Sequence, residues 1–205
     1  MERHPCSWKD AAIPLLSLHL MVFGACVFHP MTIRPTVDPA VIAAAREPGA
    51  ENVDLAIPLA EDTRSEKDVG TRGDVRFGAE VTTEKDVSQL VTEALRSGFT
   101  NKGYHLVESN QKATLKIRIL EYRTALQPGF WASKATARVL IAASLIDEVT
   151  HQIEWEKEFS SVAEKGRVLY DSKKHREITL TDALSDVVGK ILSDEGLRAS
   201  IRKYN

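Results

Sequence analysis

Residues 115–119 read Leu-Lys-Ile-Arg-Ile, a stretch that alternates apolar and basic side chains without a break. This alternation is typical of a β-strand that buries one face and exposes the other. The stretches 137–145 and 153–159 alternate in the same way, and the polar residues 147–152 between them predict a hairpin turn. Because one face of such a sheet stays in water, we expect the helices to cover only the other face.

Three segments are predicted to be helical. In residues 87–102 the apolar side chains recur at intervals of three and four, with Thr83 as the expected N-cap and Gly103 as the end of the helix. A second amphipathic stretch covers residues 180–192. A short final helix is expected over 194–204.

The remaining segments complete the expected fold. Shorter alternating stretches at 53–59, 74–81 and 104–107 predict further strands, and the polar residues 60–73 predict an exposed loop. The order is strand, helix, three strands, helix. It predicts an α+β fold, a two-layer sandwich with a mostly antiparallel sheet and its helices on one face.

The composition is that of a globular protein, and it argues against some kinds of partner and site. The 205 residues are 43% apolar and 27% charged, and the net charge of −2 gives no electrostatic reason to expect a nucleic-acid partner. The two cysteines are Cys6 and Cys26. Residues 27–205 therefore form no disulfide among themselves and offer neither a thiol nucleophile nor a cysteine-ligated zinc site.

The first 26 residues have the organisation of an export signal. Residues 11–25 carry no charge, and they are followed at once by Cys26. This stretch is too short to span a bilayer as a helix, which takes about 20 residues, but it suits the apolar region of a signal peptide. A core helix with Cys26 as a buried thiol, an uncleaved anchor and a plain secreted protein remain as alternatives.

The sequence Phe23-Gly24-Ala25-Cys26 resembles a lipobox, the motif that lipoprotein signal peptidase recognises. Phe23 and Gly24 depart from its usual form, which has Leu followed by Ala or Ser. The resemblance implies cleavage before Cys26 and a diacylglyceryl group on its sulfur, and two or more acyl chains suffice for stable anchoring. Val27 stands where an Asp tends to retain lipoproteins in the inner membrane. It therefore implies the outer membrane, with the folded part facing the periplasm.

We therefore expect three regions along the chain. They are a lipoprotein signal peptide over residues 1–25, a lipidated cysteine with a flexible tether over 26–51, and one globular domain over 52–205. The tether prediction rests on four prolines between residues 30 and 48. A flexible chain of this length spans about 25–30 Å, with one short extended piece near 32–37.

The sequence nominates no catalytic residues, no metal site and no cofactor. It contains no G-x-S-x-G, no H-E-x-x-H and no phosphate-binding glycine-rich loop. Asp147, Glu148 and His151 lie close together and could in principle hold a metal. Residues of these kinds are common in solvated turns, which is the favoured interpretation.

An acidic row, Glu154, Glu156 and Glu158, lies on one face of a predicted strand. It could meet a basic partner, or its members could pair across the sheet with Lys116 and Arg118. Cross-sheet pairing is the favoured interpretation.

Two surface features are candidates for contact. Phe130 and Trp131 lie where a turn between two strands is expected, and exposed aromatic residues at a turn can contact a partner or a membrane interface. The favoured interpretation is that both rings fold back over the sheet edge. The basic run 173–176 could touch anionic lipid headgroups, although a solvated loop is favoured.

As a whole, the chain resembles the YajG-type family of bacterial outer-membrane lipoproteins. The features that carry the resemblance are Cys26 with its signal, Thr32-Ile33-Arg34-Pro35, the predicted helix 87–102 running into Gly103-Tyr104, the strands at 115–117 and 137–146, and the C-terminal amphipathic helix. The resemblance implies a location in the outer membrane and an α+β fold, and it implies no catalytic residues.

Three functions are compatible with these features. The favoured one is a non-catalytic lipoprotein that binds another envelope protein or supports an envelope complex, with the membrane contacted through lipid on Cys26. A lipid- or glycan-binding transport accessory, holding its ligand between sheet and helices, is the alternative. A hydrolase of envelope polymers is third, because it needs a positioned acid and base that the sequence does not nominate.

Overall fold

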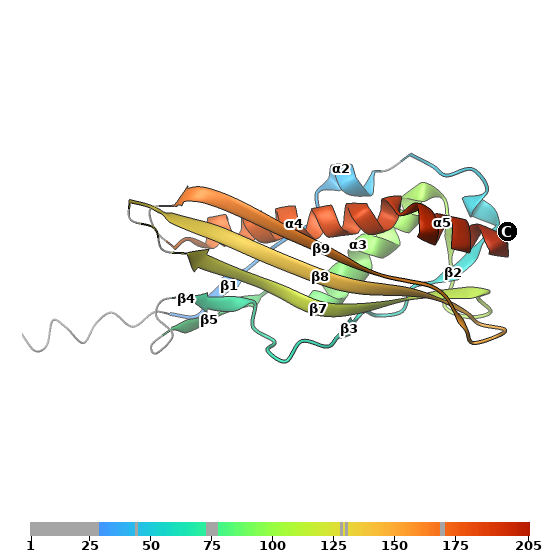
Figure 1. Cartoon of the computed structure of the whole chain (residues 1–205), viewed down its shortest axis with the longest axis horizontal. Coiled ribbons are helices and arrows are strands. Elements are labelled where there is room, and N and C mark those ends of the chain that lie inside the picture. The colour runs from blue at the N-terminus through green and yellow to red at the C-terminus, as the bar shows by residue number, and fades with distance from the viewer. Residues whose placement is uncertain (1–28, 44, 73–77, 128, 130, 169–170) are drawn as a thin grey trace, which may run out of the picture.

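The computed structural model describes residues 29–205, except 44, 73–77, 128, 130 and 169–170. In this part of the chain a long sheet forms one layer and the helices form the other (Figure 1). The elements are β1 (Met31–Ile33), α2 (Pro39–Ile42), η1 (Ala50–Asn52), β2 (Asp54–Ala56), β3 (Glu61–Asp62), β4 (Gly70–Arg72), β5 (Ala79–Thr83), α3 (Val87–Lys102), β6 (His105–Leu106), β7 (Ala113–Gln127), β8 (Ser133–Asp147), β9 (Ile153–Val168), α4 (Lys173–Ser193), α5 (Glu195–Ile201) and η2 (Arg202–Tyr204). The α+β two-layer sandwich predicted from the sequence is confirmed.

Three long antiparallel strands form the body of the main sheet. β7 pairs with β8, and β8 pairs with β9. The short strands β2, β3 and β6 lie on the β7 side and pair in parallel, which gives the order β6-β2-β7-β8-β9 with β3 also on β7. β1, β5 and β4 form a separate three-stranded sheet.

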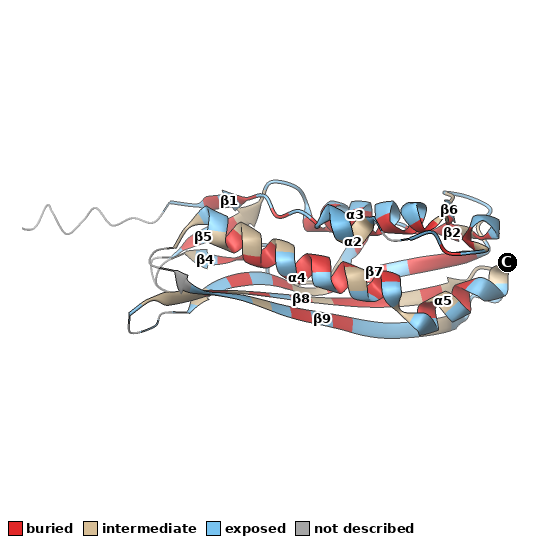
Figure 2. Cartoon of the chain, turned by 90° about the horizontal axis from the view of Figure 1, so that it is seen from above, coloured by how far each residue is buried: buried red, intermediate tan, exposed pale blue. Residues whose placement is uncertain are grey.

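The core lies between the inner face of this sheet and the helices. α4 runs along β8 and β9, with α3 beside it (Figure 2). Many of the side chains with no exposed surface come from alternate strand positions and from one stripe of α4, among them Leu115, Ile119, Val139, Ile141, Leu145, Leu180, Leu184, Val188 and Ile191. On the outer face of β7, Lys116 and Arg118 are exposed, so one face of the sheet is wet, as the alternation predicts.

The helix predicted over 87–102 is α3, but its N-cap differs from the prediction. The Asp86 carboxylate accepts hydrogen bonds from the backbone N–H groups of Ser88 and Gln89, so Asp86 takes the place expected for Thr83. A carboxylate one residue before the first helical turn reaches these orphan N–H groups directly. Gly103 ends the helix in the left-handed conformation, with a φ of 102°, as predicted.

Residues 31–42 belong to the folded body, so the tether predicted over 26–51 needs correction there. β1 pairs in parallel with β5, and Met31, Ile33 and Val37 are buried. The prolines that favoured a tether suit this extended segment equally well, because proline fits extended chain that needs no N–H donor. The globular domain therefore begins before residue 52.

The segment between β1 and α2 is held by a ladder of hydrogen bonds to α4. Alternate backbone N–H groups donate to side-chain oxygens on successive turns of the helix: Arg34 to Glu177 (2.8 Å), Thr36 to Thr181 (3.1 Å) and Asp38 to Ser185 (2.8 Å). Two residues of extended chain advance about 6.6 Å and four residues of helix advance about 6.0 Å. The spacing of alternate residues in the extended segment therefore matches the spacing of every fourth residue in α4 over these three hydrogen bonds.

Residues 60–73 were predicted to form an exposed loop, but part of this segment is strand and packs against the rest of the domain. They contain β3 and β4, and the Val69 side chain has no exposed surface. The strand predicted over 53–59 is the shorter β2. The one predicted over 74–81 corresponds in part to β5, while residues 73–77 lie outside the described residues.

Candidate functional site

Trp131 is the most exposed of the large apolar side chains in the described residues, at 87% of its surface. It lies on the turn between β7 and β8. The interpretation that the rings fold back over the sheet edge is therefore wrong for Trp131. Phe130, its predicted partner in a contact site, lies outside the described residues, and the contact role of both stays a prediction.

The basic run 173–176 is the first turn of α4 and not a solvated loop. Lys173 and Lys174 are exposed, whereas the Arg176 side chain is only 1% exposed. Its Nε and Nη2 donate to the two carboxylate oxygens of Asp171 at 2.7 and 2.9 Å. Further hydrogen bonds go to the backbone oxygens of Thr71 (3.0 Å) and Thr124 (3.3 Å). Arg176 thus joins α4 to β4 and β7, and this role explains its burial.

Asp147, Glu148 and His151 form the predicted hairpin turn between β8 and β9. The Asp147 carboxylate accepts hydrogen bonds from the N–H groups of Val149 (2.8 Å) and Thr150 (2.6 Å). Within the described part of the chain, no group of three or more His, Cys, Asp and Glu side chains is placed to hold a metal ion. The acidic side chain here stabilises a turn.

The acidic row on β9 divides between two partners. Glu156 accepts from Arg118 across the sheet at 3.2 Å, as the favoured interpretation predicts. Glu154 instead accepts from Lys203 at 2.8 Å, near the C-terminus. Two of the three carboxylates are therefore occupied by cations of this chain.

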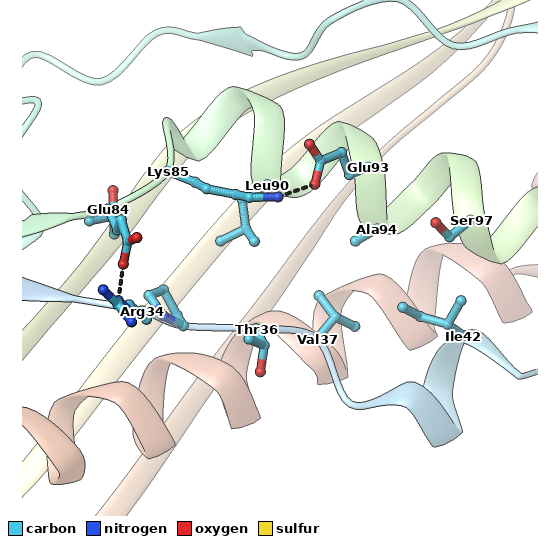
Figure 3. Close-up of a pocket in the computed structure, with 12 residues that line it drawn as sticks. Arg34, Thr36, Val37, Ile42, Glu84, Lys85, Leu90, Glu93, Ala94 and Ser97 are labelled. Carbon is cyan, nitrogen blue, oxygen red and sulfur yellow. Dashed lines mark hydrogen bonds and ion pairs between the residues drawn. The ribbon is translucent and has the colours of Figure 1, made fainter.

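A groove of about 410 Å³ lies between the 34–42 segment and α3 (Figure 3). Its apolar lining comes from both sides: Val37 and Ile42 from the segment, Leu90 and Ala94 from the helix. Its charged groups are paired with each other, since Arg34 contacts Glu84 and Lys85 contacts Glu93 at 2.7 Å. An apolar floor with a satisfied polar rim can take an apolar group and offers no unpaired acid or base for chemistry.

The groove could not be foreseen from the sequence. Leu90 and Ala94 were assigned correctly to the apolar stripe of a helix. The groove arises because residues 34–42 pack beside that stripe, and the contacts that place them lie on α4, far along the chain. The only local signal was the short extended piece near 32–37.

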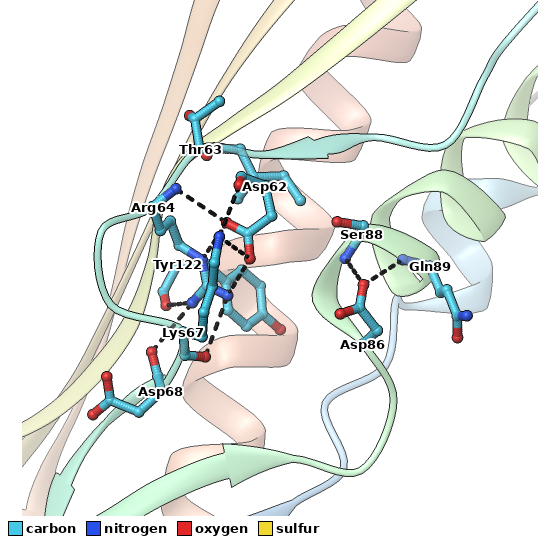
Figure 4. Close-up of polar contacts among 10 residues, drawn as sticks. Asp62, Thr63, Arg64, Lys67, Asp68, Asp86, Ser88, Gln89 and Tyr122 are labelled. Atoms are coloured by element: carbon cyan, nitrogen blue, oxygen red, sulfur yellow. Dashed lines mark hydrogen bonds and ion pairs between the residues drawn. The ribbon is translucent and has the colours of Figure 1, made fainter.

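A second polar cluster lies on the other side of α3's first turn (Figure 4). Arg64 donates to both carboxylate oxygens of Asp62, at 2.9 and 2.8 Å, and to the backbone oxygens of Tyr122 and Asp68. Lys67 also contacts the Asp62 carboxylate at 3.3 Å. The Arg64 side chain is 7% exposed, so this pair fixes the loop between β3 and β4 onto β7.

These contacts set the pKa of Asp62. Burial alone would raise the pKa of its carboxyl, but the hydrogen bonds from Arg64 outweigh burial and lower the pKa to about 2. An Asp in an unfolded chain has a pKa of about 3.9. The charged carboxylate therefore stabilises the folded state, fully above about pH 4 and progressively less as the pH falls towards 2.

We expect acid to remove this stabilisation selectively. The difference in free energy of unfolding between the protein and an Asp62→Asn variant should shrink by about 2 kcal/mol between pH 6 and pH 2. Urea denaturation at each pH measures it. Glu66→Gln, in the same loop and exposed, is the matched control, and its difference should change far less. A difference for Asp62→Asn that stays constant with pH would contradict this role.

Comparison with known proteins supports a bacterial lipoprotein with an α+β fold. Residues 39–202 match the model of the Lipoprotein_16 family, described as uncharacterized lipoprotein. The chain belongs to this family of bacterial lipoproteins. The narrower resemblance to the YajG-type family stays a prediction. No curated protein matches the chain.

Solved structures resemble this chain at low sequence identity. A protein of Xanthomonas campestris from the DUF330 family has a TM-score of 0.60 at 11% identity, over 84% of this chain and 96% of that one. A minor lipoprotein of Acinetobacter baumannii has a TM-score of 0.44 at 13% identity, over 71% of this chain and 92% of that one. The first likeness supports the architecture described above and carries nothing about function.

Within the described residues, no helix is both long and apolar enough to cross a bilayer. Cys26 and the predicted signal peptide lie outside these residues.

Proposed function

We propose that this chain is a lipid-anchored protein of the bacterial outer membrane. Lipid on Cys26 holds it, its folded part faces the periplasm, and that part binds or supports another envelope protein without catalysing a reaction. The observation that carries the proposal is membership of a lipoprotein family, in a chain whose cysteine directly follows an uncharged stretch of signal-peptide length.

The groove supports a binding role over a chemical one. Its lining side chains are apolar where they are buried and paired where they are charged. Protein contact sites commonly have this arrangement, an apolar centre within a polar rim. A segment of another envelope protein that lays apolar side chains between residues 34–42 and α3 would fit it.

Site-specific cross-linking in intact cells tests this role. A photoreactive amino acid in place of Ser97, exposed at the groove, should give discrete cross-linked products. The same group in place of Lys116, exposed on the outer face of the sheet, is the matched control and should give few. Products from the Ser97 position should fall strongly in a Cys26→Ser background. Only monomer from both positions would contradict the binding role.

The groove also favours one alternative, a transport accessory that carries a lipid or glycan. Its volume of about 410 Å³ is within the range of small-molecule sites. The ligand would then lie between the 34–42 segment and α3, and not between sheet and helices as expected. Native mass spectrometry separates the two functions. A bound lipid that survives purification and is lost in Leu90→Asp would favour the carrier, whereas its absence would favour the protein-binding role.

A further inference from the structure

Several elements meet at one end of the molecule, the end that carries Trp131. Ser133, at the start of β8, pairs with Val168 at the end of β9, which precedes the first turn of α4. Arg34, just after β1, is hydrogen-bonded to Glu177 near the same end of α4. Figures 1 and 2 show the start of β1, the start of β8 and the first turn of α4 together at this end. We call it the β7–β8 end.

Four residues lie between Cys26 and Met31, where β1 begins, so five Cα–Cα steps join the two. Even fully extended, they span at most about 17 Å. Since residues 31–42 are packed on the body, they add nothing to this reach. A lipid on Cys26 therefore keeps the β7–β8 end close to the bilayer.

The opposite end lies a full strand length from the attachment point. β8 has 15 residues, which corresponds to about 50 Å from one end to the other. The β8–β9 turn, with its exposed Val149, lies beyond the far end of this strand. The two hairpin turns of one sheet thus differ sharply in their distance from the attachment point, and they differ in distance from the membrane when the long strands stand away from it.

The chemistry of the β7–β8 end suits a lipid headgroup region. Trp131 is 87% exposed, and tryptophan concentrates at membrane–water interfaces because its ring is apolar and its N–H is polar. Lys165 on β9 and Lys174 on α4 are exposed at the same end, where their charges favour anionic headgroups. Two further lysines there, Lys134 and Lys173, form ion pairs with Glu164 and Glu177. They therefore add little to the attraction for anionic headgroups.

We propose that the β7–β8 end is the membrane-contacting face of this protein, and that the Trp131 ring inserts into the headgroup region of the bilayer that holds the lipid on Cys26. The inference rests on the proposed lipid anchor and adds an orientation to it. The long strands point away from the membrane, and the β8–β9 turn is presented to the periplasm.

Quenching of tryptophan fluorescence by brominated lipids tests this orientation. The protein is lipidated and purified with Trp155→Phe, so that Trp131 is the only tryptophan after residue 25. It is reconstituted in vesicles of phosphatidylethanolamine and phosphatidylglycerol that contain brominated phosphatidylcholine. The matched control carries Trp131→Ser and Val149→Trp in addition to Trp155→Phe, which moves the reporter to the other hairpin turn.

We expect the bromine atoms to quench Trp131 at least two-fold more than the Val149→Trp reporter, with a blue-shifted emission. In Cys26→Ser protein this quenching should largely disappear. Equal quenching of the two reporters, in protein that floats with the vesicles, would overturn the orientation and leave the anchor intact. Protein that carries no lipid and does not float would overturn both proposals.

A second measurement uses the unsubstituted tryptophans, in case Trp155→Phe disturbs packing. Iodide in the aqueous phase should quench the lipidated protein less when vesicles are present than when it is held in detergent, by about the share of emission due to Trp131. Equal quenching in both conditions would contradict insertion. Shielding that also occurs in Cys26→Ser protein without vesicles would indicate a protein contact at Trp131, and it would equally overturn the proposal.

Discussion

Replacing Arg176 by Met is expected to lower the free energy of unfolding by about 3–5 kcal/mol, the usual cost of removing one partner of a buried ion pair. The side chain is 1% exposed and joins three parts of the chain through Asp171, Thr71 and Thr124. Methionine has a similar volume but no donors. It would leave the Asp171 carboxylate and two backbone oxygens without their bonds to Arg176.

Chemical denaturation followed by circular dichroism measures this loss. Arg123→Met is the matched control, because Arg123 neighbours Thr124 on β7 but is exposed. Its free energy of unfolding should stay within about 0.5 kcal/mol of the unsubstituted protein. If the two variants are equally stable, Arg176 does not hold α4 to the strands as described.

Gly70→Ala is expected to destabilise the protein by at least about 2 kcal/mol, because conformational strain and a steric clash act together. Gly70 has a φ of 150°, which side-chain-bearing residues rarely adopt. A Cβ at this position would lie 2.2 Å from the backbone oxygen of Thr124. That oxygen belongs to β7 and accepts from Arg176, so it cannot move away without loss of a second contact.

Gly166→Ala is the control for Gly70→Ala. Gly166 also lies in a strand, but a Cβ there would meet no atom within 4 Å. Thermal unfolding should show a clear decrease of the midpoint for Gly70→Ala and little change for Gly166→Ala. Equal midpoints would mean that β4 can withdraw from β7 without cost.

The parts of the fold that could be predicted depend on local repetition. Leu115, Ile117 and Ile119 alternate strictly, and the structure places them on the buried face of β7. The stripe over 87–102 predicted α3 and its end at Gly103, although the predicted N-cap lies three residues before Asp86. In both cases the side chains that determine burial lie within one element, so the sequence pattern contains the information.

The parts that were missed depend on contacts between distant residues. Arg176 lies in a basic run that looks solvated, and its burial depends on backbone oxygens of β4 and β7. Residues 34–38 look like a tether because their hydrogen-bond partners are side chains of α4, more than 140 residues later. Periodicity within a window cannot report such partners.

The candidate site residues also differ in whether a local sequence pattern could identify them. The sequence named Trp131 as a candidate but favoured a ring folded back on the sheet, and the exposure of Trp131 contradicts that interpretation; its contact role stays a prediction. The groove beside α3 and the Asp62–Arg64 pair each depend on a packing arrangement between segments that local patterns do not describe.

The central claim is the lipid anchor on Cys26, and intact-mass spectrometry of membrane-fractionated protein tests it most directly, beside a Cys26→Ser variant. The account predicts a mature chain that begins at residue 26 and carries the added mass of acyl chains, and it predicts that this mass is absent from the variant. An unmodified mass, or one that still includes residues 1–25, would contradict the anchor and with it the orientation proposed for the β7–β8 end.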